Sequence, residues 1–306
     1  MPETLLYAHP VVSSGERPGS LPYAAELRRE LSARNQRYTT DHRLVSRESY
    51  GDPPVVCYLP REDGAAHGNF LPQTYTRILG HRGWASRLHK VHAQARGRLP
   101  REDRRWRELD SSNSSDALLM NIFCFPGILK NRRVFDRLGI ETPGMPEFGM
   151  KAKVPLANGH FDRTEVDMRL GNLLVEAKLT ETDFQSAEPK LVEAYRDFSE
   201  VFSQPDLPRN GRLYLSYQLL RNVLAAFANQ CSFCVMVDAR RPDLIEAWYA
   251  VLRCVRPTRL RLECKIITWQ ELSEGLPRKL QRFLEEKYGI TSPAGLSAPA
   301  ARPRTP

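Results

Sequence analysis

Two short runs of residues, 164–170 and 173–179, are separated by the dipeptide Gly171-Asn172. The first run alternates polar and apolar side chains, which is typical of a β-strand with one buried face. A two-residue loop that begins with glycine predicts a tight hairpin with a type II′ turn. Because such a turn fixes the register, Leu170 should face Leu173 across the hairpin.

This register places two acidic side chains opposite each other. Asp167 lies across from Glu176 and Glu165 across from Lys178, and alternation puts all four on one face. The other face is expected to enter the core with a set of apolar side chains: Val166, Met168, Val175, Ala177 and Leu179. Opposed carboxylates with Cβ atoms ~5 Å apart destabilise a sheet unless a cation lies between them.

Oxygen ligands at this spacing favour Mg²⁺ or Mn²⁺, which also bind phosphate oxygens. Lys178 lies beside the pair, where it can orient water or stabilise charge on a scissile phosphate. The alternative is a solvated hairpin face, on which pairs between Glu165 and Lys178 and between Asp167 and Arg169 relieve the repulsion.

The spacing of these residues resembles the signature of the PD-(D/E)xK superfamily of restriction-endonuclease-like nucleases. Asp167 is followed on the next strand by Glu176-Ala177-Lys178, and Val166 stands where the pattern has a proline. The resemblance implies an α/β fold, a restriction-endonuclease-like core with a central mixed β-sheet flanked by helices. It implies metal held by Asp167, Glu176 and the backbone carbonyl of Ala177. In this family the lysine, here Lys178, assists the attack of water on a phosphodiester.

Two further stretches, 111–123 and 217–222, are similar to an uncharacterised bacterial branch of this superfamily. On a helix over 212–229, helical spacing places Gln218, Arg221, Asn222 and Asn229 on one side. We expect this side to face the metal, with Gln218 near the catalytic centre. Arg221 and Asn222, together with Arg169, are expected to contact nucleic acid. The alternative is an ordinary solvent-facing stripe.

A serine-rich stretch, 111–116, offers several N-caps to an apolar helix predicted over 117–125. Many PD-(D/E)xK nucleases also use an acid from an upstream helix. Asp116 is the best-placed candidate for that role, and its alternative role is simply that of an N-cap.

The remaining body alternates helices and strands, which indicates an α/β sheet covered by helices. Predicted strands cover 148–156, 233–237 and 262–269, and predicted helices cover 186–202, 212–229, 244–252 and 277–287. The predicted organisation is a loosely structured extension over 1–70, a basic helical segment over 71–110, a nuclease-like domain over 111–290 and a disordered tail over 291–306.

The chain is basic, with 45 Lys and Arg residues against 36 Asp and Glu and a net charge of +9. Of the basic residues 36 are Arg, which suits a polyanionic partner, although a GC-rich genome favours Arg codons in any protein. The densest basic run covers 77–107. No run approaches the ~20 apolar residues of a membrane span, and no secretory signal is evident, so a cytoplasmic protein is expected.

These features predict a Mg²⁺- or Mn²⁺-dependent nuclease that hydrolyses nucleic acid, with DNA as the expected substrate. The alternative is a catalytically silent nucleic-acid-binding module with the same fold. The basic run over 77–107 motivates this alternative, because affinity that comes from phosphate contacts needs no metal.

Overall fold

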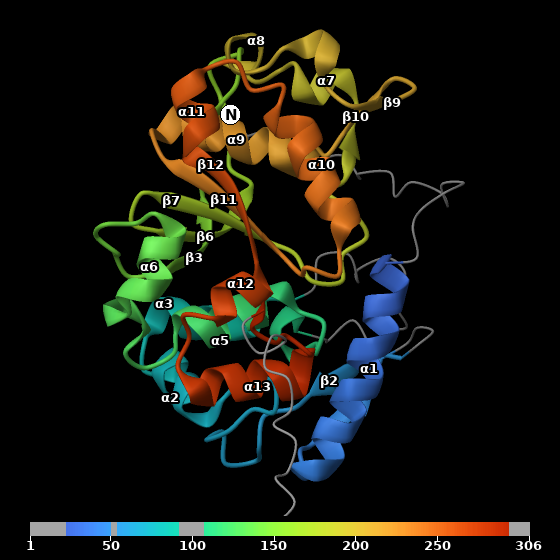
Figure 1. The fold of residues 1–306 in the computed structure, drawn as a ribbon, viewed down its shortest axis with the longest axis vertical. Helices are drawn as coiled ribbons and strands as arrows, with labels where there is room; N and C mark the ends of the chain where they lie inside the picture. Colours follow the sequence, from blue (N-terminus) through green and yellow to red (C-terminus); the bar gives the residue numbers. More distant parts are fainter. Residues whose placement is uncertain (1–22, 50–53, 92–106, 294–306) are drawn as a thin grey trace, which may run out of the picture.

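The computed structural model describes residues 23–49, 54–91 and 107–293 of the chain. Within them, five strands form a central mixed sheet in the order β12-β11-β7-β6-β3 (Figure 1). Their bounds are Glu147–Lys151 for β3, Glu165–Leu170 for β6, Leu173–Ala177 for β7, Ser232–Val237 for β11 and Cys264–Thr268 for β12. Strand β6 pairs antiparallel with β3 and with β7, whereas β7, β11 and β12 run parallel to one another.

The predicted hairpin between β6 and β7 is confirmed. The strands pair in the expected register, from Leu170 opposite Leu173 to Met168 opposite Val175. A type II′ turn requires a positive φ at its first central residue only. Gly171 has a φ of +60°, and Asn172 does not adopt a positive φ. A Cβ at Gly171 would lie 2.9 Å from the carbonyl oxygen of Thr142, so glycine is needed there for space as well.

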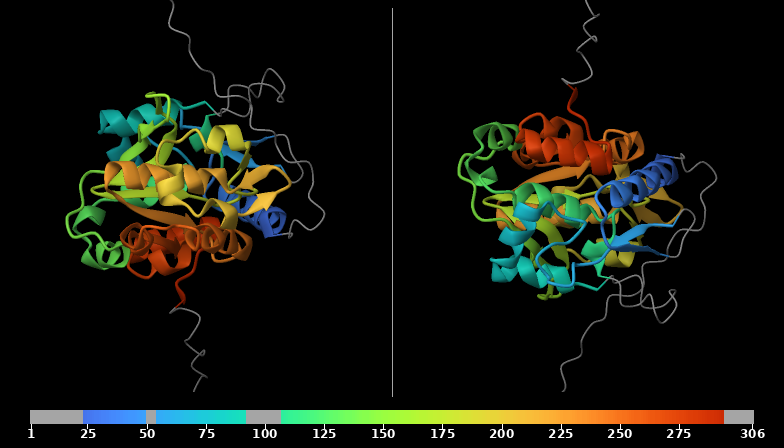
Figure 2. Two further views of the ribbon diagram at one scale, coloured as in Figure 1. Left: turned by 90° about the horizontal axis from the view of Figure 1, so that it is seen from above. Right: turned by 90° about the horizontal axis from the view of Figure 1, so that it is seen from below.

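Two layers of helices enclose the sheet (Figures 1 and 2). One face is covered by α9 (Tyr217–Asn229), α10 (Pro242–Leu252) and α11 (Thr258–Glu263), and the other by α5 (Ser115–Phe123), α12 (Trp269–Ser273) and α13 (Arg278–Tyr288). The first core joins sheet residues such as Leu174 and Val235 to the leucines of α9. The second joins residues such as Val175 and Met236 to α5, α12 and α13. The expected α/β class, with a mixed sheet flanked by helices, is confirmed.

Four of the apolar side chains predicted to share a face do enter the second core: Met168, Val175, Ala177 and Leu179. The fifth, Val166, lies in the first core instead. The ladder between β6 and β7 ends at Met168, and beyond it β6 pairs with β3 alone. The start of β6 is therefore not held to the plane of β7.

The part of the predicted N-terminal extension that the structure describes is ordered. The helix α1 (Tyr23–Asp41) packs along α13 and buries Leu27, Leu31 and Asn35, which follow one another at four-residue spacing. A hairpin of β1 (Ser46–Glu48) and β2 (Val56–Tyr58) follows. Residues 1–22 and, at the other end, most of the predicted tail lie outside the described residues.

The helix predicted over 186–202 is wrong. This segment contains β8 (Ser186–Ala187), α7 (Pro189–Val192) and α8 (Phe198–Val201). Between the two short helices the backbone pairs with another segment, since the carbonyl of Ala194 accepts from Ala157 and the amide of Arg196 donates to Pro155. These hydrogen bonds replace those that a continuous helix would make.

Several other boundaries differ from the predictions. The helix predicted from residue 212 begins at Tyr217, because β10 (Leu213–Leu215) precedes it. The strand predicted over 262–269 is shorter, because α11 ends just before β12 and the capping box of Thr268 starts α12 just after it. The strand predicted over 148–156 divides into β3 and β4 (Val154–Pro155). The remaining elements are α2 Pro72–Leu79, α3 Arg82–Ala85, η1 Ser86–His89, η3 Glu108–Asp110, η4 Ile128–Lys130, α6 Arg132–Leu138, β5 Phe161–Asp162, η5 Gln204–Asp206 and β9 Arg209–Asn210.

The basic segment predicted over 71–110 is helical over α2, α3 and η1, and residues 92–106 of it lie outside the described residues. Across the described part of the chain, none of the helices combines the length and the apolar character needed to cross a membrane.

Candidate active site

The acidic pair lies where β6 begins and β7 ends, between α9 on one side and α5 on the other. The ladder between the two strands stops at Met168 and Val175, one position short of the acids. In place of the next ladder bond, the carboxylate of Asp167 accepts the backbone N–H of Ala177 at 2.8 Å. The side chain of Asp167 is thereby fixed next to the backbone of the predicted catalytic triplet.

Glu176 is 2% exposed and has a donor on each carboxylate oxygen. Its Oε1 accepts from Nζ of Lys178 at 2.8 Å, and its Oε2 accepts from Nδ2 of Asn222 on α9 at 2.6 Å. The structure therefore brings Glu176, Lys178 and Asn222 into one buried cluster beside Asp167.

The pKa values of Lys178 and Asp167 are both raised, which favours the charged form of the lysine and the neutral form of the acid. Burial lowers the pKa of Lys178, but the charges of Glu176, Glu181 and Asp167 outweigh burial and leave that pKa above its ordinary value. Burial raises the pKa of Asp167, and the nearby charges of Glu176 and Asp116 raise it further. Lys178 is thus a permanent ammonium, and Asp167 lies in a field of like charge that a cation would relieve.

Arg221 and Asn222 point inward rather than to solvent. Asn222 is completely buried, and its Oδ1 accepts from Nε and Nη2 of Arg221 at 3.1 and 3.0 Å. Arg221 also donates to the backbone carbonyl of Glu165 at 3.1 Å. In this geometry Asn222 holds Glu176 and Arg221 holds Asn222, and the nucleic-acid contacts expected of the two residues stay a prediction.

Arg169 and Gln218, the other two residues predicted for the site, have contacts outside this cluster. Arg169 donates to the carbonyl of Gly171, so its guanidinium is directed toward the hairpin turn. Gln218 lies one helical turn before Asn222, and its backbone amide donates to the carbonyl of Phe184. The ring of Phe184 lies 5.7 Å from Nζ of Lys178, and the catalytic role of Gln218 stays a prediction. Its Oε1 is buried and accepts no hydrogen bond from the described residues.

Asp116 belongs to a second charged cluster beside the first. Ser114 caps α5, since its hydroxyl accepts the N–H of Ala117, so Asp116 is not the N-cap. Its Oδ2 instead accepts from Nη2 of Arg87 at 2.7 Å, and Nη1 of Arg87 donates to Glu165 at 3.0 Å. Lys90 lies 3.2 Å from Glu165. The sequence marked Arg87 and Lys90 only as members of a long basic run.

Gly149 on β3 makes room for the guanidinium of Arg87, which joins Asp116 to Glu165. Its φ is +65°, and a Cβ there would overlap the guanidinium of Arg87. We expect Gly149→Ala to lower the free energy of unfolding by ~1–3 kcal/mol more than Gly159→Ala, because overpacking adds to the backbone strain. Gly159 is the matched control, since its φ is +82° and nothing lies within 4 Å of a Cβ there. Urea unfolding measures both losses, and equal losses would contradict the close packing of Arg87 against Gly149.

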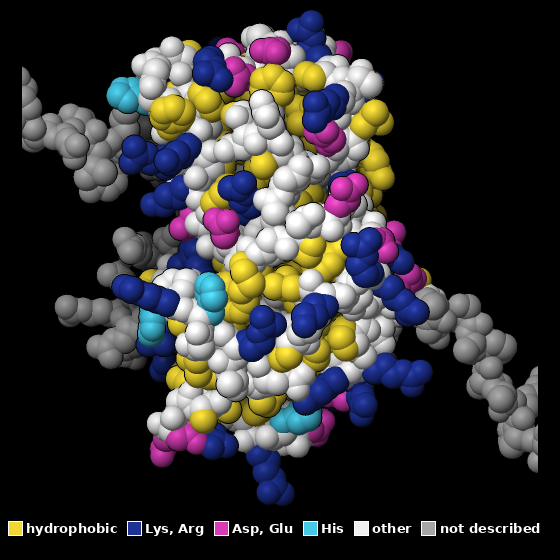
Figure 3. Space-filling view, turned by 90° about the vertical axis from the view of Figure 1, so that its left-hand side faces the viewer, with side chains coloured by type: hydrophobic (Ala, Val, Ile, Leu, Met, Phe, Trp, Pro, Cys, Tyr) yellow, Lys and Arg dark blue, Asp and Glu magenta, His cyan; other side chains and the backbone are white. Residues whose placement is uncertain are grey.

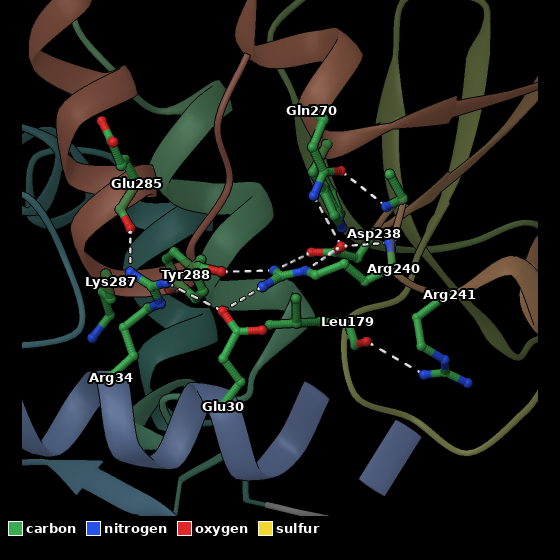
Figure 4. Close-up of polar contacts among 12 residues, drawn as sticks. Glu30, Arg34, Leu179, Asp238, Arg240, Arg241, Gln270, Glu285, Lys287 and Tyr288 are labelled. Carbon is green, nitrogen blue, oxygen red and sulfur yellow. Dashed lines mark hydrogen bonds and ion pairs between the residues drawn. The ribbon is translucent and has the colours of Figure 1, made fainter. Parts of the chain in front are cut away.

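Arg241, a buried arginine that no sequence pattern indicated, holds the loop that follows Lys178. Arg241 has no exposed surface and donates to the carbonyls of Glu181 at 2.7 Å and Thr182 at 3.0 Å. Figure 4 shows it beside Arg240, which binds Asp238 after β11 and reaches Glu30 of α1. These contacts tie the ends of the parallel strands to α1 and fix the backbone just beyond the triplet Glu176-Ala177-Lys178.

The acidic side chains near the hairpin limit how a divalent metal could be held. Among residues 23–49, 54–91 and 107–293, no three His, Cys, Asp or Glu side chains converge into a group that could hold a metal ion. Asp167 and Glu176 nevertheless share one end of the hairpin. Mg²⁺ commonly binds through one or two carboxylates and completes its shell with water and phosphate oxygens. Two carboxylates and one backbone carbonyl are therefore a sufficient protein contribution for that ion.

A mixed five-stranded sheet with helices on both faces defines a restriction-endonuclease-like fold. The family model described as "Restriction Endonuclease associating with ARP" matches residues 31–289, and the chain belongs to this family. No curated protein and no solved structure matches the chain. The resemblance noted at the hairpin is confirmed at the level of a restriction-endonuclease-like family.

Proposed function

We propose that this protein is a metal-dependent phosphodiester hydrolase that acts on DNA. The observation that carries the proposal is the cluster of Asp167, Glu176 and Lys178 at the end of the β6–β7 hairpin. The family description supports a nuclease role. The basic net charge of +9 agrees with a polyanionic substrate.

The residues that would hold Mg²⁺ or Mn²⁺ are Asp167, Glu176 and the carbonyl of Ala177. When bound, such an ion supplies Lewis-acid polarisation of a phosphodiester and neutralises its charge. The like charges that raise the pKa of Asp167 support this assignment, because a cation between the acids would remove the repulsion. Asn222 acts as a positioning residue, since it holds Glu176 from α9.

Lys178 has a role that its charge state restricts. Its pKa is raised by Glu176, Glu181 and Asp167, so the side chain carries its proton and cannot take one from water. A fixed ammonium can instead stabilise the negative charge that develops on the phosphate in the transition state. The hydrogen bond to Glu176 holds Nζ in place for that purpose.

The direct test is incubation of the purified chain with supercoiled DNA, linear duplex, single-stranded DNA and RNA. We expect strand cleavage of DNA with Mg²⁺ or Mn²⁺, no cleavage in EDTA, and recovery when metal is restored, because the carboxylates need a divalent ion to engage the phosphate. Gel electrophoresis measures the products. Cleavage that is unchanged in EDTA would overturn the metal-dependent assignment.

One observation favours a second function, a catalytically silent nucleic-acid-binding module. Both oxygens of Glu176 are already hydrogen-bonded, to Lys178 and Asn222, so this carboxylate has its partners without metal. Binding of DNA that survives EDTA and weakens steeply with salt, with no cleavage under any metal, would select this function.

A further inference from the structure

A second concave site lies away from the acidic cluster, at the end of the molecule where α1 terminates. It is a groove of about 610 Å³ between the C-terminal end of α1, the segment after β2, the start of α2, and α13. In Figure 1 these elements lie together at the lower end, which the right-hand view of Figure 2 faces. None of the residues that line the groove belongs to the candidate active site.

The interior of the groove is largely apolar and aromatic. The apolar lining comes from all four elements: Tyr38, Leu44, Val45, Leu59, Ala66, Phe70, Leu71, Pro72 and Phe283. The rings of Tyr38 and Phe283 lie edge to face, with centroids 6.2 Å apart. Val45 remains 54% exposed at the rim. The volume falls in the range of ~300–1,000 Å³ that is usual for ligand sites.

The rim of the groove is cationic. It carries Arg43, Arg61, Lys279 and Arg282. The acid in the lining, Glu286, pairs with His42 at 3.5 Å, and Arg61 pairs with Asp63 outside the groove lining. Arg43 and Arg282 are exposed, and neither side chain makes a hydrogen bond or ion pair with the described residues. Figure 3 shows one side of the molecule, on which Lys and Arg side chains lie among hydrophobic ones over the lower half. An anionic ligand with a flat apolar part matches this lining.

We propose that the groove binds unpaired nucleotides of a single-stranded nucleic acid. Bases would pack on the apolar interior and on the half-buried ring of Tyr38 while the phosphates contact Arg43 and Arg282, which is the combination that single-strand-binding sites use. In a duplex the faces of the bases are stacked on one another and their Watson–Crick edges are paired, so these faces are not free to pack in the groove. The inference rests on the proposed function, because it specifies the strand form of the substrate.

The test uses fluorescence anisotropy with a short labelled DNA single strand in EDTA, where no cleavage is expected. The full chain is compared with the double variants Arg43→Gln/Arg282→Gln and Arg259→Gln/Arg261→Gln. The second pair is the matched control, since both arginines are exposed on α11 and the change in charge is the same. We expect the groove variant to bind more weakly and to reduce the slope of log K against log salt by about 1.4, at ~0.7 for each lost phosphate contact.

A local probe tests whether nucleotides enter the groove itself. All six native cysteines are buried, so Val45→Cys can be labelled selectively with an environment-sensitive dye. We expect a dye response that saturates with the single strand and is weak with duplex of the same sequence. A response to an acidic peptide and none to the single strand would overturn the proposal and indicate a protein partner.

The remaining outcomes separate this proposal from the proposed function. Equal affinity and equal salt slope in the two double variants would overturn the groove proposal, even if the chain cleaves DNA. Loss of binding in the groove variant alone, in a chain that never cleaves, would support the groove and reject the nuclease.

Discussion

The variant Asp167→Asn should lose DNA cleavage by on the order of 10³-fold while the fold stays intact. The asparagine oxygen can still accept the N–H of Ala177, which Asp167 now accepts at 2.8 Å. It cannot supply the negative charge that a metal bound at the proposed site would require. Burial and the charges of Glu176 and Asp116 raise the pKa of Asp167, so removing this charge should not lower the free energy of unfolding. Single-turnover cleavage and urea unfolding measure the two effects.

The control for this experiment is Asp136→Asn, which removes an exposed carboxylate on α6. We expect it to cleave as the wild type does, because surface substitutions away from a site change little. Calorimetry with Mn²⁺ should show weaker binding only in Asp167→Asn. Wild-type cleavage by Asp167→Asn, or unchanged Mn²⁺ binding, would contradict the role given to this residue.

The hairpin was predictable because its register depends on local chemistry alone. A glycine at the first turn position fixes the turn type, and the turn fixes which residues oppose each other from Leu170 to Met168. The same logic placed Asp167 near Glu176. It did not predict that the ladder would end there, with the Asp167 carboxylate replacing a backbone hydrogen bond to Ala177.

The partners of the site were not predictable, because they come from segments far apart in the chain. Helical spacing grouped Arg221 with Asn222, but only the packing of α9 on the sheet aims Asn222 at Glu176. Arg87 is 29 residues from Asp116 and 78 from Glu165. No local pattern distinguishes such a side chain from the other arginines of a basic run.

The helix predicted over 186–202 is wrong for a related reason, because contacts with a distant segment decide the structure there. Apolar residues in this segment have helical spacing and are buried, yet of Tyr195, Phe198 and Phe202 only Phe198 lies in a helix, the short α8. Pairing of the backbone around Ala194 and Arg196 with the segment near Pro155 decides the structure. Tertiary hydrogen bonding overrode local propensity here.

The second large effect is expected at Lys287, which is completely buried on α13. Its Nζ donates to Oδ1 of Asn35 at 2.9 Å and lies 3.6 Å from the ring centroid of Tyr58. Among the described residues no carboxylate pairs with it, and burial holds its pKa well below the ordinary value. A lysine in this position is a cost to folding at neutral pH, because the unfolded chain keeps the ammonium fully hydrated.

Lys287→Met should therefore raise the free energy of unfolding at neutral pH, on the order of 1–3 kcal/mol, since each unit of lowered pKa corresponds to ~1.4 kcal/mol. Asn35 keeps a donor in the variant, because the hydroxyl of Tyr58 also binds its Oδ1, at 2.8 Å. The comparable change at the exposed Lys279, on the same helix, should have an effect within about 0.5 kcal/mol.

The pH dependence gives the sign of this effect independently. Between the lowered pKa of the folded state and about 10.4, the pKa of an unfolded lysine, the unfolded chain binds more protons at this position than the native chain does. The wild type should consequently gain stability relative to Lys287→Met as pH rises through this window. Urea unfolding of both proteins across that range measures the difference. A variant less stable than the wild type at neutral pH, or a difference that does not change with pH, would show that Asn35 and the tyrosine rings fully compensate the buried ammonium.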